Sequence, residues 1–236
     1  MLETPWMRRV LLFALLPVLI CISGEELNAQ VPMDSGVIGA KAVWTPTKGA
    51  QKRIADCNPT SMQCLTDVMR ESRASSQAVQ FATLLNHEGD EGYMTSFRKM
   101  GKVDLVTVIH PFSANTNSAY WLVNGTPPVL ETALTGEDQE NTDAVDERKR
   151  VDIKTQPLYT SLVRRFPKLD VELSRNTFEN MRRLPEGGQE FVFSYALVNG
   201  CRACEIGGYA HVGFDFDGAG NFLAAKLLRL SRAHHK

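Results

Sequence analysis

Hydrophobic and polar positions alternate most regularly in the last third of the chain. Three such runs span residues 189–198, 207–216 and 221–230, and turn-rich segments separate them. Alternation with a period of two places successive side chains on opposite faces of a strand, so we predict an antiparallel meander of three strands. In the middle strand one predicted face carries Ala210, Val212, Phe214 and Phe216, and the other carries Tyr209, His211, Gly213, Asp215 and Asp217. We expect the first face to pack on helices and the second to be open.

The first half of the chain shows helical spacing instead. Apolar residues recur every three or four positions in 62–72 and 76–88, and Ser or Thr residues precede both runs as candidate N-caps. A short third helix is predicted over 91–100, because Met94 and Phe97 lie three positions apart and a glycine follows the segment.

The middle of the chain changes period. Residues 103–110 and 119–123 are β-branched and apolar, and 129–134 is predicted to return as a strand partner of the second run. Residues 135–150 are polar, highly charged and aperiodic, which predicts a surface loop, and helical spacing returns in 157–166. Helices concentrated in the first half and antiparallel strands in the second define an α+β fold.

A short internal similarity joins two of the predicted strands. The segment AYWLVNG at 119–125 and the segment SYALVNG at 194–200 share the ending Leu-Val-Asn-Gly. One match is not a sustained period, so we interpret it as two strands that end in the same turn residues. The alternative is a pair of related halves, each with a helix and a meander.

The N-terminus has the layout of a secretory signal peptide. Two arginines precede an apolar run at 10–22, and a short polar stretch ends at Ala29. We therefore predict a signal peptide over 1–29 with cleavage near Ala29, and a periplasmic or secreted protein. A retained anchor is the alternative, but the run is shorter than the roughly 20 residues of a membrane span. Cys21 raises a lipoprotein alternative, which the bulky residue before it disfavours.

The remaining chain is predicted to be one soluble domain. Residues 30–56 lack periodicity and are predicted to form an irregular N-terminal arm, and 57–236 a single α+β domain with a charged loop at about 135–150. Hydrophobic residues make up 43% of the chain, the formal net charge is −1, and the basic residues are scattered. The sequence therefore contains no basic cluster of the kind that binds nucleic acid or an anionic membrane surface, and we predict neither as a partner. We also predict no membrane span after signal cleavage.

Four of the five cysteines follow the predicted signal peptide: Cys57, Cys64, Cys201 and Cys204. An even number in an exported chain predicts disulfides. Three pairings are possible. The local one, Cys57–Cys64 with Cys201–Cys204, requires no assumption about the fold, whereas the crossed pairings require distant segments to meet.

Cys201 and Cys204 also form a C-x-x-C motif. Haem attachment needs a histidine directly after the second cysteine, and Glu205 stands there instead. A thioredoxin-like centre places the first cysteine at a helix N-terminus, but this motif lies between two predicted strands. A zinc site would need the other two cysteines, whose spacing is wider than usual. We interpret the motif as a structural disulfide, with redox activity as the alternative and zinc third.

The candidate binding face comprises Tyr209, His211 and Asp215, which share one side of the predicted middle strand. A general base at His211 would need a nucleophile or acid nearby, and the sequence identifies none, so we predict no catalytic residue, metal or cofactor. The acidic segment 215–221 is similar to the start of a calcium loop, but Ala219 takes the third ligand position. A hairpin turn is predicted there.

Segments 103–129 and 200–222 resemble parts of uncharacterised exported bacterial proteins that carry a C-terminal G-C-x-x-C segment. The resemblance implies a compartment and no activity. The sequence therefore predicts an exported, non-enzymatic binding or interaction module of the cell envelope, with a protein or small ligand as its partner. The alternative is a thiol–disulfide exchange protein that uses Cys201 and Cys204, and a hydrolase built around His211 and Asp215 is a weaker third class.

Overall fold

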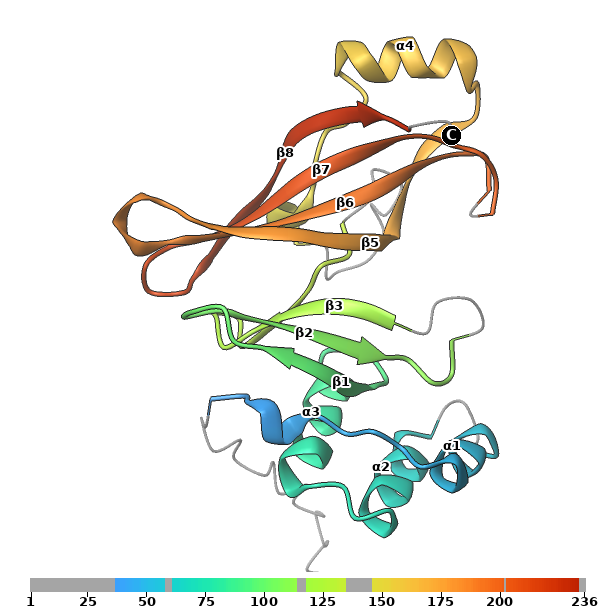
Figure 1. Ribbon diagram of the computed structural model, residues 1–236, viewed down its shortest axis with the longest axis vertical. Coiled ribbons are helices and arrows are strands. Elements are labelled where there is room, and N and C mark those ends of the chain that lie inside the picture. Colours follow the sequence, from blue (N-terminus) through green and yellow to red (C-terminus); the bar gives the residue numbers. More distant parts are fainter. Residues whose placement is uncertain (1–36, 58–60, 114–117, 135–145, 202, 234–236) are drawn as a thin grey trace, which may run out of the picture. The chain divides into compact units, whose positions relative to one another are not determined.

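The computed structural model describes residues 37–57, 61–113, 118–134, 146–201 and 203–233, without the side chains of 173–175. The predicted signal peptide lies outside these residues. The described residues all belong to one compact unit. It contains four α-helices and two antiparallel sheets, with three of the helices at its N-terminal end (Figure 1). The predicted α+β fold is confirmed.

Three capped helices open the domain: α1 (Lys48–Ala55), α2 (Met62–Glu71) and α3 (Ser76–His87). In each case the hydroxyl of the residue before the helix accepts a hydrogen bond from a backbone N–H of the first turn. The caps are Thr47, Ser61 and Ser75. Such a cap satisfies a donor that the helix itself leaves unpaired and contributes about 1 kcal/mol.

The predicted irregular arm over 30–56 is wrong in its second half, because residues 48–55 form α1. Thr47 supplies the N-cap, and Ala50 and Ile54, four positions apart, are buried against the other helices. One turn of apolar spacing was too short a signal to separate this helix from a loop. The domain therefore starts before residue 57.

Sheet 1 is a four-stranded antiparallel meander with strand order β1-β2-β3-β4. Its strands are β1 (Tyr93–Arg98), β2 (Asp104–Ile109), β3 (Ser118–Val123) and β4 (Val129–Glu131). One face of this sheet packs on α3, through Val106, Val108 and Trp121 against Phe81 and Leu85.

The helix predicted over 91–100 is wrong, because this segment contains β1. The register with β2 shifts between Met94 and Ser96, which marks a β-bulge. The extra residue brings Met94 and Phe97, three positions apart, to the same apolar cluster beside α3. The bulge therefore gives a strand the spacing that is typical of a helix.

Sheet 2 is a second antiparallel meander, with strand order β5-β6-β7-β8. It follows α4 (Pro157–Arg165) and consists of β5 (Leu169–Arg183), β6 (Gln189–Asn199), β7 (Ile206–Phe216) and β8 (Phe222–Arg232). The last three strands are the predicted meander. β5 was not predicted, because two register shifts, at Val171/Asn176 and Phe178/Asn180, interrupt its alternation. Within the predicted charged loop, Glu147–Lys149 form a 3-10 helix, and 135–145 lie outside the described residues.

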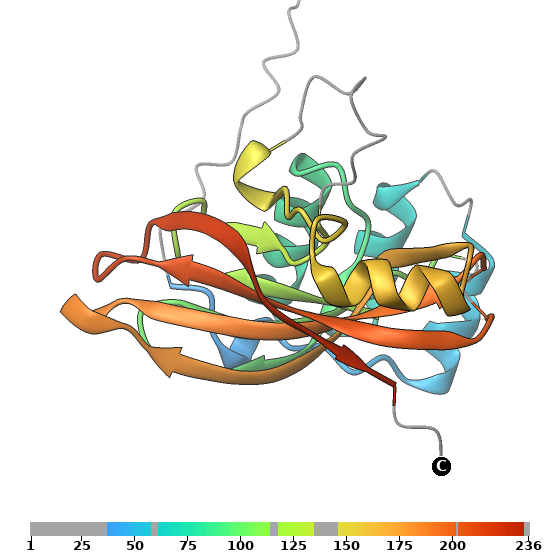
Figure 2. The same cartoon turned by 90° about the horizontal axis from the view of Figure 1, so that it is seen from above.

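The inner face of sheet 2 packs against sheet 1 (Figure 1). Phe191, Phe193, Val212 and Phe214 share one buried cluster with Leu105, Leu122 and Leu130 of sheet 1, and Leu162 of α4 joins it. The expectation that this face packs on helices is therefore correct only for α4, which lies beside β8 (Figure 2). Most of the surface is covered by another sheet, whose strands the sequence pattern did not assign to it.

Hydrogen bonds to backbone groups also join the two sheets at one end. Gln189 at the start of β6 accepts a hydrogen bond from the Val103 backbone N–H (2.8 Å) and donates one to the Val103 carbonyl (3.1 Å). Nearby, Thr126 N–H donates to the Gly220 carbonyl at 2.9 Å. A Cβ at Gly125 would lie 2.9 Å from that same carbonyl, so this close approach favours glycine. We call these contacts the polar seam.

The repeated Leu-Val-Asn-Gly does not mark equivalent positions. Both sheets follow a helix and have the same strand order. However, residues 122–125 span the end of the third strand of sheet 1, whereas 197–200 span the end of the second strand of sheet 2. The interpretation as a shared strand-ending turn therefore accounts for the match.

Candidate binding face on the outer side of sheet 2

The side chains of sheet 2 that point away from sheet 1 form the candidate site, which we call the outer face. Ala210, Val212, Phe214 and Phe216 belong to the inner core, so the alternate residues of β7 point outward. The cross-strand register assigns their neighbours to the same face. The outer face includes Thr177, Glu179, Arg182, Glu190, Ser194, Tyr209, His211, Gly213, Asp215, Lys226, Arg229 and Ser231.

The first polar network on this face joins four charged side chains from four strands. Arg182 on β5 forms an ion pair with Glu190 on β6. The Lys226 amine on β8 lies 3.0 Å from Glu190 Oε1 and 2.5 Å from Asp215 Oδ2. A Cβ at Gly213 would lie 3.0 Å from Glu190 Oε1, so this glycine leaves room for the glutamate to lie flat across β7.

Charge is layered in this network. The side chains of Glu190 and Asp215 are 2% and 16% exposed, whereas those of Arg182 and Lys226 are 56% and 47% exposed. Burial raises the pKa of Asp215, the bond to Lys226 opposes that shift, and the neighbouring Glu190 adds to it. The bond to Asp215 in turn raises the pKa of Lys226. The cations are therefore exposed to solvent, whereas the two carboxylates are largely removed from it.

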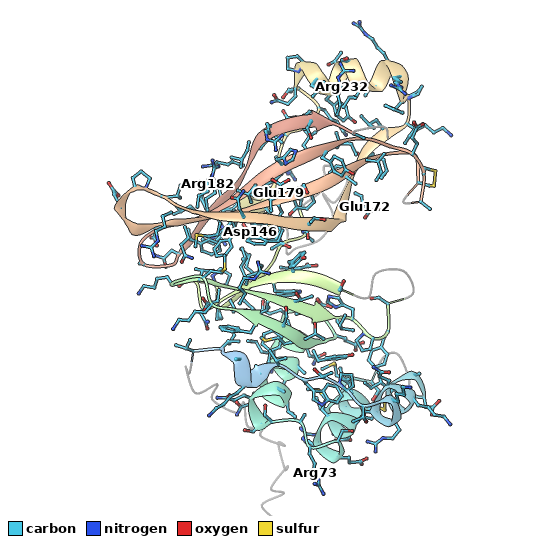
Figure 3. The ribbon with its side chains drawn as sticks, in the orientation of Figure 1. Arg73, Asp146, Glu172, Glu179, Arg182 and Arg232 are labelled. Atoms are coloured by element: carbon cyan, nitrogen blue, oxygen red, sulfur yellow. A yellow bond between two sulfur atoms is a disulfide. The ribbon has the colours of Figure 1, made fainter. Side chains whose placement is uncertain are left out.

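The second network centres on His211, which is buried. Its Nδ1 lies 2.8 Å from Glu179 Oε1, and its Nε2 lies 2.8 Å from Ser231 Oγ. Arg229 Nη2 lies 3.3 Å from Nδ1. Glu179 falls within the bulge between Phe178 and Asn180 of β5, and Figure 3 labels it together with Arg182 of the same strand.

The structure places Tyr209, His211 and Asp215 on one face, as the alternation indicates, but it does not bring His211 and Asp215 together. Asp215 bonds to Lys226, and His211 bonds to Glu179 and Ser231. Sequence reasoning missed Ser231, although its alternation along β8 could have placed it near His211. It also missed Glu179, because the bulge in β5 interrupts the alternation from which the face of this side chain could be predicted.

Both disulfides join cysteines close in sequence: Cys57–Cys64 and Cys201–Cys204. The predicted disulfides and the local pairing are therefore present in the structure. Cys57 is buried between α1 and α2, so this bond joins the end of α1 to the first turn of α2. Cys201 and Cys204 are exposed in the connection between β6 and β7, where Cys204 N–H donates to the Cys201 carbonyl at 2.9 Å. The element that follows is a strand, so no helix dipole acts on the first cysteine.

The predicted hairpin turn at 215–221 is present. Asp217 Oδ1 accepts bonds from the backbone N–H groups of Ala219 (2.9 Å) and Asn221 (2.8 Å), and its Oδ2 accepts one from the Asn221 amide (2.8 Å). The carboxylate is thus engaged within the turn. Across the described ranges, no group of three or more His, Cys, Asp or Glu side chains is placed to hold a metal ion.

A separate titratable cluster lies beside sheet 1. His110 Nδ1 lies 2.9 Å from Asp90 Oδ1. Burial alone would lower the pKa of His110, but the bond to Asp90 and the charges of Asp90 and Glu131 outweigh burial and raise it. Burial raises the pKa of Glu131 and lowers that of Lys149, while each partly offsets the shift of the other. Its members come from sheet 1, from the loops beside it and from the 3-10 helix at 147–149.

Comparison with known protein families, with curated proteins and with solved structures finds no match to this chain. What the fold defines is therefore a general class, an α+β protein with two stacked antiparallel meanders and two local disulfides. Among the described helices, none combines the length and apolar character needed to cross a membrane. The resemblance to exported bacterial proteins remains a prediction.

Proposed function

We propose that this protein is an exported binding module of the cell envelope and that it binds an acidic partner protein through the outer face of sheet 2. The observation that carries the proposal is the layered charge on that face. Glu190 and Asp215 lie beneath Arg182 and Lys226, so an approaching surface meets the cations first. Complementary charge steers association and fixes orientation, which favours an acidic partner over a basic one.

Export is supported by two independent features. The signal-like segment 1–29 would direct the chain out of the cytoplasm. Disulfides persist in oxidising compartments, and the chain carries two of them. The partner would therefore reside in the envelope or outside the cell.

Site-specific cross-linking in cells that produce the protein tests the binding face. A photoreactive phenylalanine derivative would replace Thr177, which is exposed on the outer face, or Gln77, which is exposed on α3. We expect discrete cross-linked products with an acidic protein from position 177 and none from position 77. Equal products from both positions, or none from position 177, would contradict the proposal.

Charge reversal gives the matched control for that experiment. Lys226→Glu on the outer face should abolish the cross-link from position 177, because it replaces an exposed cation with an anion. Lys52→Glu on the exposed side of α1 makes the same change in net charge and should leave the cross-link intact. Loss of the cross-link in both variants would show that net charge rather than this face is responsible.

A second function, thiol–disulfide exchange, is favoured by one observation: both Cys201 and Cys204 are exposed. Insulin reduction and a glutathione titration separate the two functions. A structural disulfide predicts no turnover, a loss of about 2 kcal/mol of stability in the double serine variant, and an unchanged cross-link from position 177. Turnover that disappears in Cys201→Ser would instead assign exchange activity to the motif.

A further inference from the structure

A serine, a histidine and a glutamate from three strands of sheet 2 form a continuous chain of polar contacts. Ser231 Oγ lies 2.8 Å from His211 Nε2, and His211 Nδ1 lies 2.8 Å from Glu179 Oε1. A nucleophile bonded to a base, with the base oriented by a third group, is the arrangement that activates serine. We propose that Ser231 is the nucleophile of an acyl-transfer site for carboxylic esters, with His211 as its base and Glu179 as the residue that positions His211.

The contacts of His211 decide which nitrogen carries the proton. Arg229 can only donate, so a hydrogen bond from Arg229 would need an unprotonated Nδ1. Glu179 accepts, so its bond needs a proton on Nδ1. The Glu179 contact is the shorter, 2.8 Å against 3.3 Å, so we assign the proton to Nδ1. The lone pair on Nε2 then points at the Ser231 hydroxyl and accepts its hydrogen.

The sheet brings these residues together although they lie far apart in sequence. Ser231 is the cross-strand partner of Tyr209, so it lies diagonal to His211 on the neighbouring strand. Glu179, in the bulge of β5, reaches His211 across β6. The side chain of His211 is 8% exposed, whereas Ser231 is partly exposed. The base is therefore shielded from water while the nucleophile stays accessible.

The reaction needs only water as co-reactant. Ser231 Oγ attacks the carbonyl carbon of the ester while its proton moves to His211 Nε2. The tetrahedral intermediate then expels the alcohol, which takes that proton, and the acyl group remains on Ser231 as an ester. Water attacks the acyl-serine, His211 takes the water proton and returns it to Ser231 Oγ, and the carboxylic acid leaves. Glu179 stabilises the imidazolium that forms in both steps.

Labelling of the full exported chain with an alkyl fluorophosphonate tests this activity. Ser231 Oγ would form a bond to phosphorus, the P–F bond would break, fluoride would leave, and His211 would take the hydroxyl proton. Intact mass and peptide mapping should show one adduct, on the peptide that contains Ser231, and none there in Ser231→Ala.

Ser194→Ala is the matched control, because Ser194 is the cross-strand neighbour of His211 on the same face but belongs to neither network. Its labelling rate should equal that of the unchanged chain. His211→Gln should lower the rate at Ser231 by a factor of about 100 or more, since general-base catalysis typically contributes that much. Glu179→Gln keeps an acceptor for Nδ1–H but removes the charge, and should lower the rate by about tenfold or more.

The pH profile and the folded state complete the test. The labelling rate should depend on pH in the unchanged chain and lose that dependence in His211→Gln, because the variant lacks the general base. Glu179 is at the surface, so we expect Glu179→Gln to fold. Near-UV circular dichroism checks that its fold equals that of the unchanged chain. The labelling rates of these two proteins can then be compared even if His211→Gln unfolds. Absence of labelling, labelling spread over several serines, or labelling of Ser231 unaffected by Glu179→Gln would overturn the proposal. The cross-link from position 177 is read separately, so either proposal can fail alone.

Discussion

At the scale of single residues, one glycine determines how the outer face is arranged. Glu190 is buried although its strand face points away from the core, and it can lie there because Gly213 has no side chain. The ammonium and guanidinium of Lys226 and Arg182 then close over the carboxylate. Sequence reasoning placed Gly213 on the correct face, but it gave no reason for a glycine there, because the partner lies on another strand.

Gly213→Ala should lower the free energy of unfolding by about 1–3 kcal/mol, because the new Cβ would crowd the Glu190 side chain, 3.0 Å from its Oε1, and require that side chain to shift. Urea titration measures the change. Gly49→Ala is the matched control: an added Cβ meets only Thr47 Oγ1, at 3.9 Å, and Gly49 lies in α1. That variant should gain about 0.5–1 kcal/mol from helix propensity. Equal losses in both variants would mean that Glu190 does not depend on Gly213.

His110 makes stability depend on pH. Burial lowers its pKa in the folded protein, but the bond to Asp90 and the charges of Asp90 and Glu131 together outweigh burial, so the pKa is raised. A group with a raised folded pKa stabilises the fold below its unfolded pKa of about 6.5, and this contribution is lost as pH rises through the folded value. His110→Gln should therefore lower stability more at about pH 5.5 than at about pH 8.5. Asp90→Asn should remove the same pH dependence, and a constant difference across that range would contradict the assignment.

At the scale of elements, the strands with uninterrupted alternation were predictable and those with bulges were not. β6, β7 and β8 follow the alternating pattern of 189–230. The bulge at Met94/Ser96 gave β1 a helical spacing, and the bulge at Phe178/Asn180 interrupted the alternation of β5, so neither strand was predicted. The same difference separates the site residues that the sequence could place from the one that it could not. Tyr209, His211 and Asp215 could be placed on one face, but Glu179 depends on a bulge that has no clear signal in a single sequence.

The two faces of β7 should differ in their contribution to stability. Phe214 is fully buried and its ring contacts Phe193 and Phe222, whereas Tyr209 is partly exposed on the outer face. Phe214→Ala should cost about 3–5 kcal/mol, the usual range for truncating a large core side chain. Tyr209→Ala should cost much less. Equal losses in a denaturant titration would show that the outer face is also covered.

At the scale of the whole molecule, the sequence predicted one α+β domain but not the stacking of two sheets. A predicted apolar strand face does not specify which surface covers it, and here sheet 1 covers most of the inner face of sheet 2. The segment before residue 57 was also underestimated, since α1 already contributes Ala50 and Ile54 to a buried cluster.

Processing of the whole chain is tested by N-terminal sequencing of the protein recovered from the envelope or medium. The signal-like segment predicts a mature N-terminus directly after Ala29 or within a few residues of it. A retained Met1 would contradict cleavage, and a lipid on Cys21 would replace this prediction with a lipoprotein. Retention in the cytoplasm would also leave the cysteines in a reducing environment, so thiol titration provides an independent check.

Within the polar seam, hydrogen exchange at the Val103 backbone amide can report whether the two sheets are docked. Pairings within each meander join strands that are neighbours in sequence, whereas the Val103 N–H bonds to a side chain 86 positions away. Meanders with local pairings can form early and separately, and contacts between them close later. Hydrogen exchange at Val103 should therefore follow separation of the sheets, while amides in the centre of β7 exchange only on global unfolding. Gln189→Ala should speed exchange at Val103 by tenfold or more without equal change in β7, and parallel changes at both would mean that the sheets open as one unit.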